Sequence, residues 1–215
     1  MINYDNVVFN GINKAVYLAY ASVLWVLFSL PVFTLGASTT ALYYSVHKVI
    51  KHDTGKLFSE FWSAFKLNFK QSTVVFLLFA AILLIGVADY FVLQAYLDQG
   101  SIFKGFSVIV LVFNVGAIMI ANYVFPYIAR FQNTTKLILM NSVYFAITNI
   151  LKTLLMLVIL AVAILLVMIN PVFLAVSPGV FMFCADYLIE PIFRKYMTPE
   201  DQEAERRRNE VCNDL

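Results

Sequence analysis

Long apolar runs alternate with short polar segments along most of the chain. A helix needs about 20 apolar residues to cross a membrane, and five stretches approach or exceed that length. We expect membrane spans near residues 15–35, 72–97, 105–129, 153–169 and 172–193. The last two belong to one apolar run that is too long for a single crossing, and Asn170–Pro171 predicts the turn between them.

Residues 57–70, between the first two expected spans, predict an amphipathic helix on the cytoplasmic side. Aromatic and apolar side chains recur there with helical spacing, and polar residues fill much of the opposite face. The aromatic positions are Phe58, Phe61, Trp62, Phe65 and Phe69. Such a stripe suits a helix that lies in a membrane interface or docks on a partner, and equally one that packs on the protein's own spans. A second, weaker loop helix is expected within 134–149.

Composition makes membrane embedding close to unavoidable. Of 215 residues, 61% are hydrophobic and 13% are charged, whereas a soluble domain carries about 25% charged residues. We therefore expect an all-α integral membrane protein with five transmembrane helices in a single domain, 1–215. The first run could instead be a signal peptide, but it exceeds the ~7–15 apolar residues of one, so an uncleaved span is favoured. A net charge of +2 does not suggest a nucleic-acid partner.

The positive charges predict an orientation. Thirteen of the 15 Lys and Arg residues fall in segments that would share one side of the membrane, and only Lys14 and Lys104 fall on the other. Short loops with this bias face the cytoplasm. We expect the N-terminus outside and the tail, 194–215, in the cytoplasm. The arginines at 206–208 would lie on a short solvated helix or, alternatively, contact anionic lipids.

Five polar residues interrupt the apolar runs: Asp89, Asn114, Asn122, Asp186 and Glu190. Such residues usually face protein or water. They could form a polar path for a solute or proton, with Asp89 and Asp186 as its ionisable groups. They could also hydrogen-bond between helices and fix their packing, which is the interpretation we favour. Asp89 and Asn114 are expected at a similar depth in neighbouring spans.

No catalytic, cofactor-binding or metal site is predicted from the residue spacing. His47 and His52 are five positions apart, so they do not share a helix face as paired metal ligands would. Gly55–Lys56 lacks the glycine-rich loop of a nucleotide site. We therefore expect a protein that is not an enzyme and needs no cofactor.

A faint internal repeat relates residues 31–46 to 126–141. In each copy a proline is followed by a Thr pair and a Leu, and every match is offset by 95 residues. The copies would be parallel repeats of the kind seen in some transporters. Chance matching in apolar sequence is the alternative.

Three segments carry a resemblance to a known family. They read LPVFTLGASTTALYYSV, FSEFWSAFKLNFKQST and YVFPYIARFQNTTK. In these elements the chain resembles the YesL family of small bacterial membrane proteins, over nearly its whole length. The resemblance implies a place in the bacterial cell membrane and a link to carbohydrate uptake by ABC transporters, but no catalytic residues. We expect an accessory protein that contacts the lipid bilayer and the permease subunits of a sugar ABC transporter. A small-solute permease or channel is the alternative.

Overall fold

The computed structural model describes residues 4–51, 56–95, 101–200 and 202–203, and in these ranges the chain is helical without strands. The elements in order are α1 (Tyr4–Phe28), the 3-10 turn η1 (Val32–Thr34), α2 (Leu35–Ser45), the π-helical segment η2 (Val46–Lys51), α3 (Leu57–Ala95), α4 (Ser101–Arg130), α5 (Thr135–Thr148), α6 (Ile150–Ile169), the 3-10 helix η3 (Pro171–Ala175) and α7 (Ser177–Tyr196).

Four helices in the described residues are long and apolar enough to cross a membrane. Their apolar stretches are Gly11–Phe28, Leu57–Val92, Gly105–Arg130 and Ile150–Ile169. The prediction of five spans is therefore not confirmed. The expected fifth span, 172–193, falls on η3 and most of α7, and α7, which carries Asp186, Glu190 and Arg194, is not among these four helices. The turn at Asn170–Pro171 is confirmed. Pro178 lies in the first turn of α7, where a proline is tolerated.

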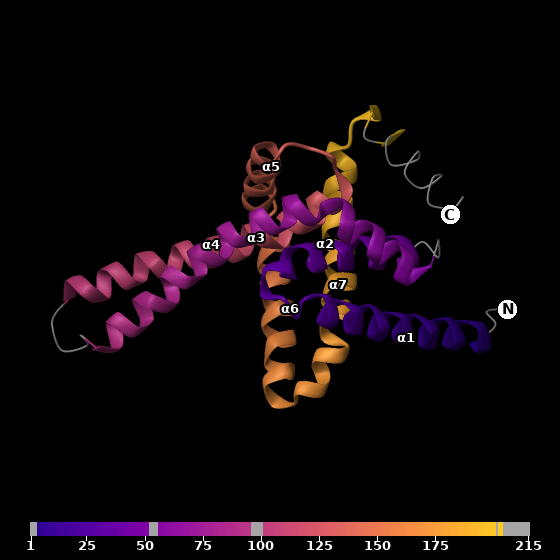
Figure 1. Ribbon diagram of the computed structural model, residues 1–215, viewed down its shortest axis with the longest axis horizontal. Helices are drawn as coiled ribbons and strands as arrows, with labels where there is room; N and C mark the ends of the chain where they lie inside the picture. Colours follow the sequence, from indigo (N-terminus) through magenta and orange to yellow (C-terminus); the bar gives the residue numbers. More distant parts are fainter. Residues whose placement is uncertain (1–3, 52–55, 96–100, 201, 204–215) are drawn as a thin grey trace.

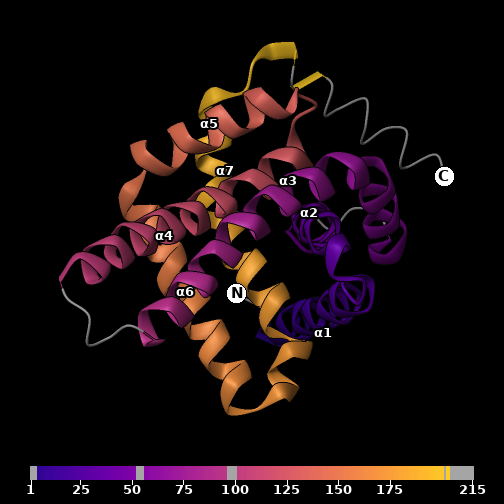
Figure 2. The ribbon, with the colours of Figure 1, turned by 60° about the vertical axis from the view of Figure 1, so that its left-hand side comes forward.

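The helices do not form a parallel bundle (Figure 1). α3 and α4 pack side by side into an arm, and α6 and α7 form a second hairpin closed by η3. α1 runs crosswise to α6 and α7, and the turned view in Figure 2 shows the two hairpins diverging from a shared centre. α2 and η2 lie in that centre and are almost wholly buried.

α1 crosses the start of α7 at very close range. The backbone N–H of Gly179 donates to Oγ of Ser22 at 2.8 Å, and this hydroxyl lies 2.9 Å from the carbonyl oxygen of Leu18. A Cβ at Gly179 would lie 2.5 Å from that same oxygen. Only glycine fits the crossing, which fixes α1 against α7.

The amphipathic helix predicted at 57–70 is not a separate element. These residues form the beginning of α3, which continues without a break for 39 residues. No Gly or Pro lies between Leu57 and Gly86, so nothing in the sequence ends the helix. At 1.5 Å per residue, α3 is about 58 Å long and must extend well beyond a ~30 Å hydrocarbon core. The second loop helix is confirmed as α5.

The segment from Pro31 to Gly36 turns the chain from α1 into the buried α2. The hydroxyl of Thr34 lies 2.6 Å from the Pro31 carbonyl oxygen. Gly36 then lets α2 approach α3, because a Cβ there would lie 2.4 Å from the carbonyl oxygen of Ser72. The hydroxyls of Thr40 and Ser72 are hydrogen-bonded at 2.9 Å one turn further along.

The end of α4 joins the same centre. Nε2 of Gln71 on α3 donates to the carbonyl oxygen of Asn133 at 2.9 Å, in the link between α4 and α5. The hydroxyl of Tyr127 accepts from the side chains of Asn133 and Asn141, at 3.0 and 2.8 Å. The three sequence segments that carry the family resemblance are therefore joined by direct hydrogen bonds.

The two copies of the faint repeat have different local structures. Pro31 lies between α1 and η1, whereas Pro126 lies inside α4. Thr39 and Thr40 belong to α2, but Thr134 precedes α5 as its N-cap. The similarity of 31–46 and 126–141 is thus not matched by a shared arrangement of helices.

We expect Gly36→Ala to destabilise the protein. The added methyl group would meet backbone and Cβ atoms that cannot rotate away, and overpacking of this kind costs about 1–3 kcal/mol. The check is thermal unfolding of the purified protein in detergent.

Gly116→Ala is the matched control, because a Cβ there meets nothing within 4 Å. Alanine is a better helix former than glycine, so this variant should be as stable as the parent or slightly more stable. Equal melting temperatures for both variants would contradict the close approach of α2 and α3.

Candidate functional site

A group of buried charges lies where η2, α4 and α7 meet. α7 places Asp186 and Glu190 one turn apart on one face, and their side chains are 0% and 3% exposed. η2 supplies His47 and Lys51, which are also one turn apart, and Arg130 is the last residue of α4. We call these five residues, together with Arg194, the ion cluster.

Asp186 binds both groups of η2. Nδ1 of His47 lies 2.7 Å from Oδ1 of Asp186, and because a carboxylate only accepts, Nδ1 carries the proton. Nζ of Lys51 lies 2.5 Å from Oδ2 of the same carboxylate. The two contacts fasten the π-helical segment to the middle of α7.

Glu190 binds two arginines. Its Oε1 accepts from Nη2 of Arg130 at 2.8 Å and from Nε of Arg194 at 3.1 Å. Its Oε2 lies 3.8 Å from Nδ1 of His47, so the imidazole lies close to both carboxylates and, of the two, hydrogen-bonds Asp186. Arg194 is the outer member of the group, with a side chain that is 63% exposed.

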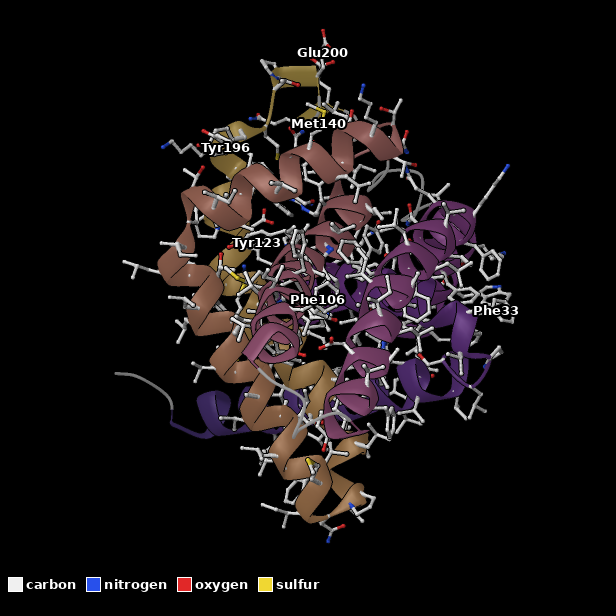
Figure 3. The ribbon with its side chains drawn as sticks, turned by 90° about the vertical axis from the view of Figure 1, so that its left-hand side faces the viewer. Phe33, Phe106, Tyr123, Met140, Tyr196 and Glu200 are labelled. Atoms are coloured by element: carbon white, nitrogen blue, oxygen red, sulfur yellow. The ribbon has the colours of Figure 1, made fainter. Side chains whose placement is uncertain are left out.

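Figure 3 shows where this end of α7 lies. Tyr196 and Glu200, just beyond the ion cluster, are at the same end of the molecule as Met140 on α5, opposite the η3 turn. Tyr196 packs on Phe145 of α5, with ring centroids 5.3 Å apart. The ion cluster therefore lies toward the end of the α6–α7 hairpin that α5 covers.

Charge balance explains why these groups tolerate burial. Isolated buried ions are very costly, and removal of one partner from a buried pair leaves an uncompensated charge. Here Lys51, Arg130 and Arg194 offset the two carboxylates, with one positive charge in excess when His47 is neutral. That excess falls on the side of Arg194, where water can reach it.

Tyr43 is buried beside the ion cluster. Its ring stacks on His47, with centroids 6.2 Å apart and planes 9° from parallel. Burial raises the pKa of the Tyr43 phenol well above its ordinary value, the carboxylates of Asp186 and Glu190 add to the rise, and Arg130 opposes it. Tyr43 therefore stays a neutral phenol and adds no charge.

A second buried ion pair ties η2 to α3. Nζ of Lys48 lies 2.9 Å from Oε1 of Glu60, and both side chains are nearly inaccessible. η2 is thus held from two sides, by α7 through His47 and Lys51 and by the first turns of α3 through Lys48.

The ion cluster has the donor atoms of a metal site but not its charge. One nitrogen of His47 and one oxygen each of Asp186 and Glu190 lie within 4.8 Å of one another. A divalent cation there would have to displace Lys51 and Arg130 from the carboxylates and would add to an existing positive excess. The arrangement is suited to fastening helices together, and the positive partners disfavour a metal.

The other predicted polar positions line two apolar hollows. Asp89 and Asn114 border the same pocket between α3 and α4. Asn114 packs directly on Gly86, where a Cβ would lie 2.5 Å from its side-chain nitrogen. Asn122 borders a different cavity, and the structure does not bring these three residues into the ion cluster.

The aromatic stripe at the start of α3 divides into two sets. Phe61 and Phe65 are buried and pack on Phe28 at the end of α1, with ring centroids 5.4 and 5.2 Å apart. Phe58 and Trp62 are 48% and 37% exposed. Phe69 is half-buried against Phe65. Packing on the protein's own helices is therefore confirmed for Phe61 and Phe65, whereas a role of the stripe in a membrane interface or in partner docking stays a prediction.

Sequence reasoning missed His47, Lys51 and Arg130. The spacing of His47 to His52 gives no sign of a site, yet His47 is buried in η2. The available signal was a matching spacing: His47 and Lys51 are four apart, as are Asp186 and Glu190. The tail arginines at 206–208 lie outside the described residues.

Comparison with known proteins places these features in a family. The family described as "Protein of unknown function, DUF624" matches residues 18–90. "Uncharacterized protein YesL" of Bacillus subtilis (strain 168) is 32% identical over 155 residues, which cover 68% of this chain and 72% of the relative. The chain belongs to the YesL family. No solved structure matches it.

The family resemblance read from the sequence is thus confirmed, and the chain is a YesL-family membrane protein with several apolar helices. The stretch that matches DUF624 contains Gly36, Ser72 and the two residues that η2 supplies to the ion cluster, His47 and Lys51. The YesL-family match therefore falls on the central helices of this fold.

We expect Glu190→Gln to lower the stability of the protein by about 3–5 kcal/mol, because it leaves Arg130 buried without its carboxylate. The variant Arg130→Gln should have a similar cost. Combining the two should cost less than the sum, since the double variant buries no unpaired charge. Unfolding in detergent measures all three.

Arg194→Gln is the control for this cycle. It removes a contact to the same oxygen of Glu190 from an exposed side chain, which is worth at most about 1 kcal/mol. Strict additivity of Glu190→Gln and Arg130→Gln would show that the ion cluster is not coupled.

Proposed function

We propose that this protein is a non-enzymatic accessory protein of the bacterial cell membrane that docks on permease subunits of a carbohydrate ABC transporter. The link to carbohydrate uptake comes from the resemblance to the YesL family. The ion cluster supports a structural role, because each carboxylate is engaged by cations from other segments.

The observation that carries the proposal is a rigid aromatic ridge at the start of α3. Phe58 and Trp62 are 48% and 37% exposed, and the Trp62 ring also packs on Phe28 and Phe65, with ring centroids 5.4 and 5.7 Å apart. Nζ of Lys66 lies 5.2 Å from the centre of the Trp62 ring. Behind them, Phe61 and Phe65 are fixed against Phe28. Exposed aromatic side chains on a preorganised helix are typical of energetically important positions in protein interfaces.

The expected orientation puts this ridge on the cytoplasmic side. Lys56, Lys66 and Lys70 flank it and are exposed, and positively charged segments are retained in the cytoplasm. If α7 crosses the membrane as a fifth span, the N-terminus would lie outside and the C-terminal tail inside. A permease subunit would be met at its cytoplasmic loops or at the adjacent membrane surface.

We expect a photo-crosslinking amino acid at Phe58 to form an adduct with a permease subunit of a sugar ABC transporter in intact cells. The crosslinked partner is identified by mass spectrometry. Trp62→Ala in the same protein should weaken the adduct, because the ridge loses its larger ring.

The matched control carries the crosslinker at Phe113, which is 71% exposed on the α3–α4 arm. That position should react with lipid. Identical protein adducts at both positions, or no permease adduct at Phe58, would contradict the docking proposal.

A small-solute permease is the second candidate. It is favoured by the acid and amide that border one pocket between two membrane helices, Asp89 and Asn114. Purified protein in liposomes would then carry a small-solute flux that Asp89→Asn abolishes without unfolding the protein. Flux that persists in the variant, or no flux in the parent, argues against this candidate.

A further inference from the structure

A partly open cavity of about 460 Å³ lies between the two diverging hairpins and the crosswise α1. α4 and α6 form two of its walls, α7 a third, and Trp25 of α1 and Leu42 of α2 lie on its inner side. Its volume is in the range of ligand-binding pockets, about 300–1,000 Å³.

The lining is apolar apart from a few polar groups. The hydroxyl of Thr39 accepts from Nε1 of Trp25 and lies 2.7 Å from the carbonyl oxygen of Leu35, so its bonds are made. Nδ2 of Asn122 donates to the carbonyl oxygen of Ile118 one turn back. That bond leaves the carbonyl oxygen and the second N–H of the Asn122 side chain available to an occupant.

The surroundings of the cavity determine what can fill it. α4 and α6, which form two of the walls, each contain a stretch that is long and apolar enough to cross a membrane. A bilayer around these stretches would bring its hydrocarbon to the opening of the cavity. Water is disfavoured, because it needs two to four polar partners and the walls offer too few. An empty cavity would forfeit the dispersion contacts of its lining atoms. The molecules at hand that match the walls are lipid chains.

We propose that this cavity is a binding site for one acyl chain of a bilayer phospholipid, with Asn122 placed to hydrogen-bond the ester group or another polar atom near the chain. The acyl chain would pack against the ring of Trp25 and the methyl group of Ala163, both of which line the cavity. The site is separate from the ion cluster and from the proposed docking ridge.

Trp25 allows a direct test, because the chain has only one other tryptophan, Trp62. In Trp62→Phe, with Trp25 as the sole reporter, phospholipid vesicles with brominated acyl chains should quench the fluorescence. Adding Ala163→Phe fills the cavity, and most of the quenching should then be lost. Ala163→Leu adds less volume and should cause a partial loss.

The reciprocal variant, Trp25→Phe, reports from Trp62 on the surface. Its quenching should not change with Ala163→Phe, which also shows that the filled protein keeps its fold. Native mass spectrometry of the parent should retain one phospholipid after delipidation, and Ala163→Phe should retain none. Unchanged Trp25 quenching in both filled variants, or equal lipid retention, would mean that Trp25 meets only surrounding lipid and would overturn the proposal.

Discussion

Two carboxylates buried one turn apart on α7 need positive partners, and the fold is arranged so that other segments bring them. His47 and Lys51 reach Asp186 from η2, and Arg130 reaches Glu190 from the end of α4. Breaking one such buried pair is strongly destabilising. The ion cluster therefore fixes which helices meet at this end of the molecule, in a protein whose outer surfaces are largely apolar and contribute little specificity.

The other close contacts serve the same arrangement. Gly36 and the Thr40–Ser72 hydrogen bond set the depth of α2 beside α3, and the Gly179–Ser22 contact sets α1 across α7. α2 and η2 contact both α3 and α7, so they connect the α3–α4 arm to the α6–α7 hairpin although the two diverge (Figure 1). The cavity between them follows from that divergence.

Much of the fold could be predicted from apolar runs and helix breakers, because these act locally. The membrane character, the turn at Asn170–Pro171 and the loop helix α5 follow directly. The sequence does not predict that α3 is one continuous helix. Its amphipathic pattern at 57–70 indicates a separate helix outside the membrane span, although no Gly or Pro ends the helix there. The ion cluster could not be located, since His47 and Asp186 are 139 residues apart and only tertiary packing brings them together. The fifth span, 172–193, is not confirmed, and the acids of this stretch are paired in the protein interior.

The most direct test of this account is the state of the His47 ring in the membrane-embedded protein. His52→Gln leaves His47 as the only histidine, so nitrogen NMR of histidine-labelled protein in lipid bilayers reports on it alone. We predict a proton on Nδ1 held in a strong hydrogen bond at neutral pH, and a clearly weaker hydrogen bond in Asp186→Asn, where a neutral amide oxygen replaces the carboxylate. A ring whose Nδ1 proton exchanges with solvent and whose signals do not change in Asp186→Asn would contradict the ion cluster as the centre of the fold.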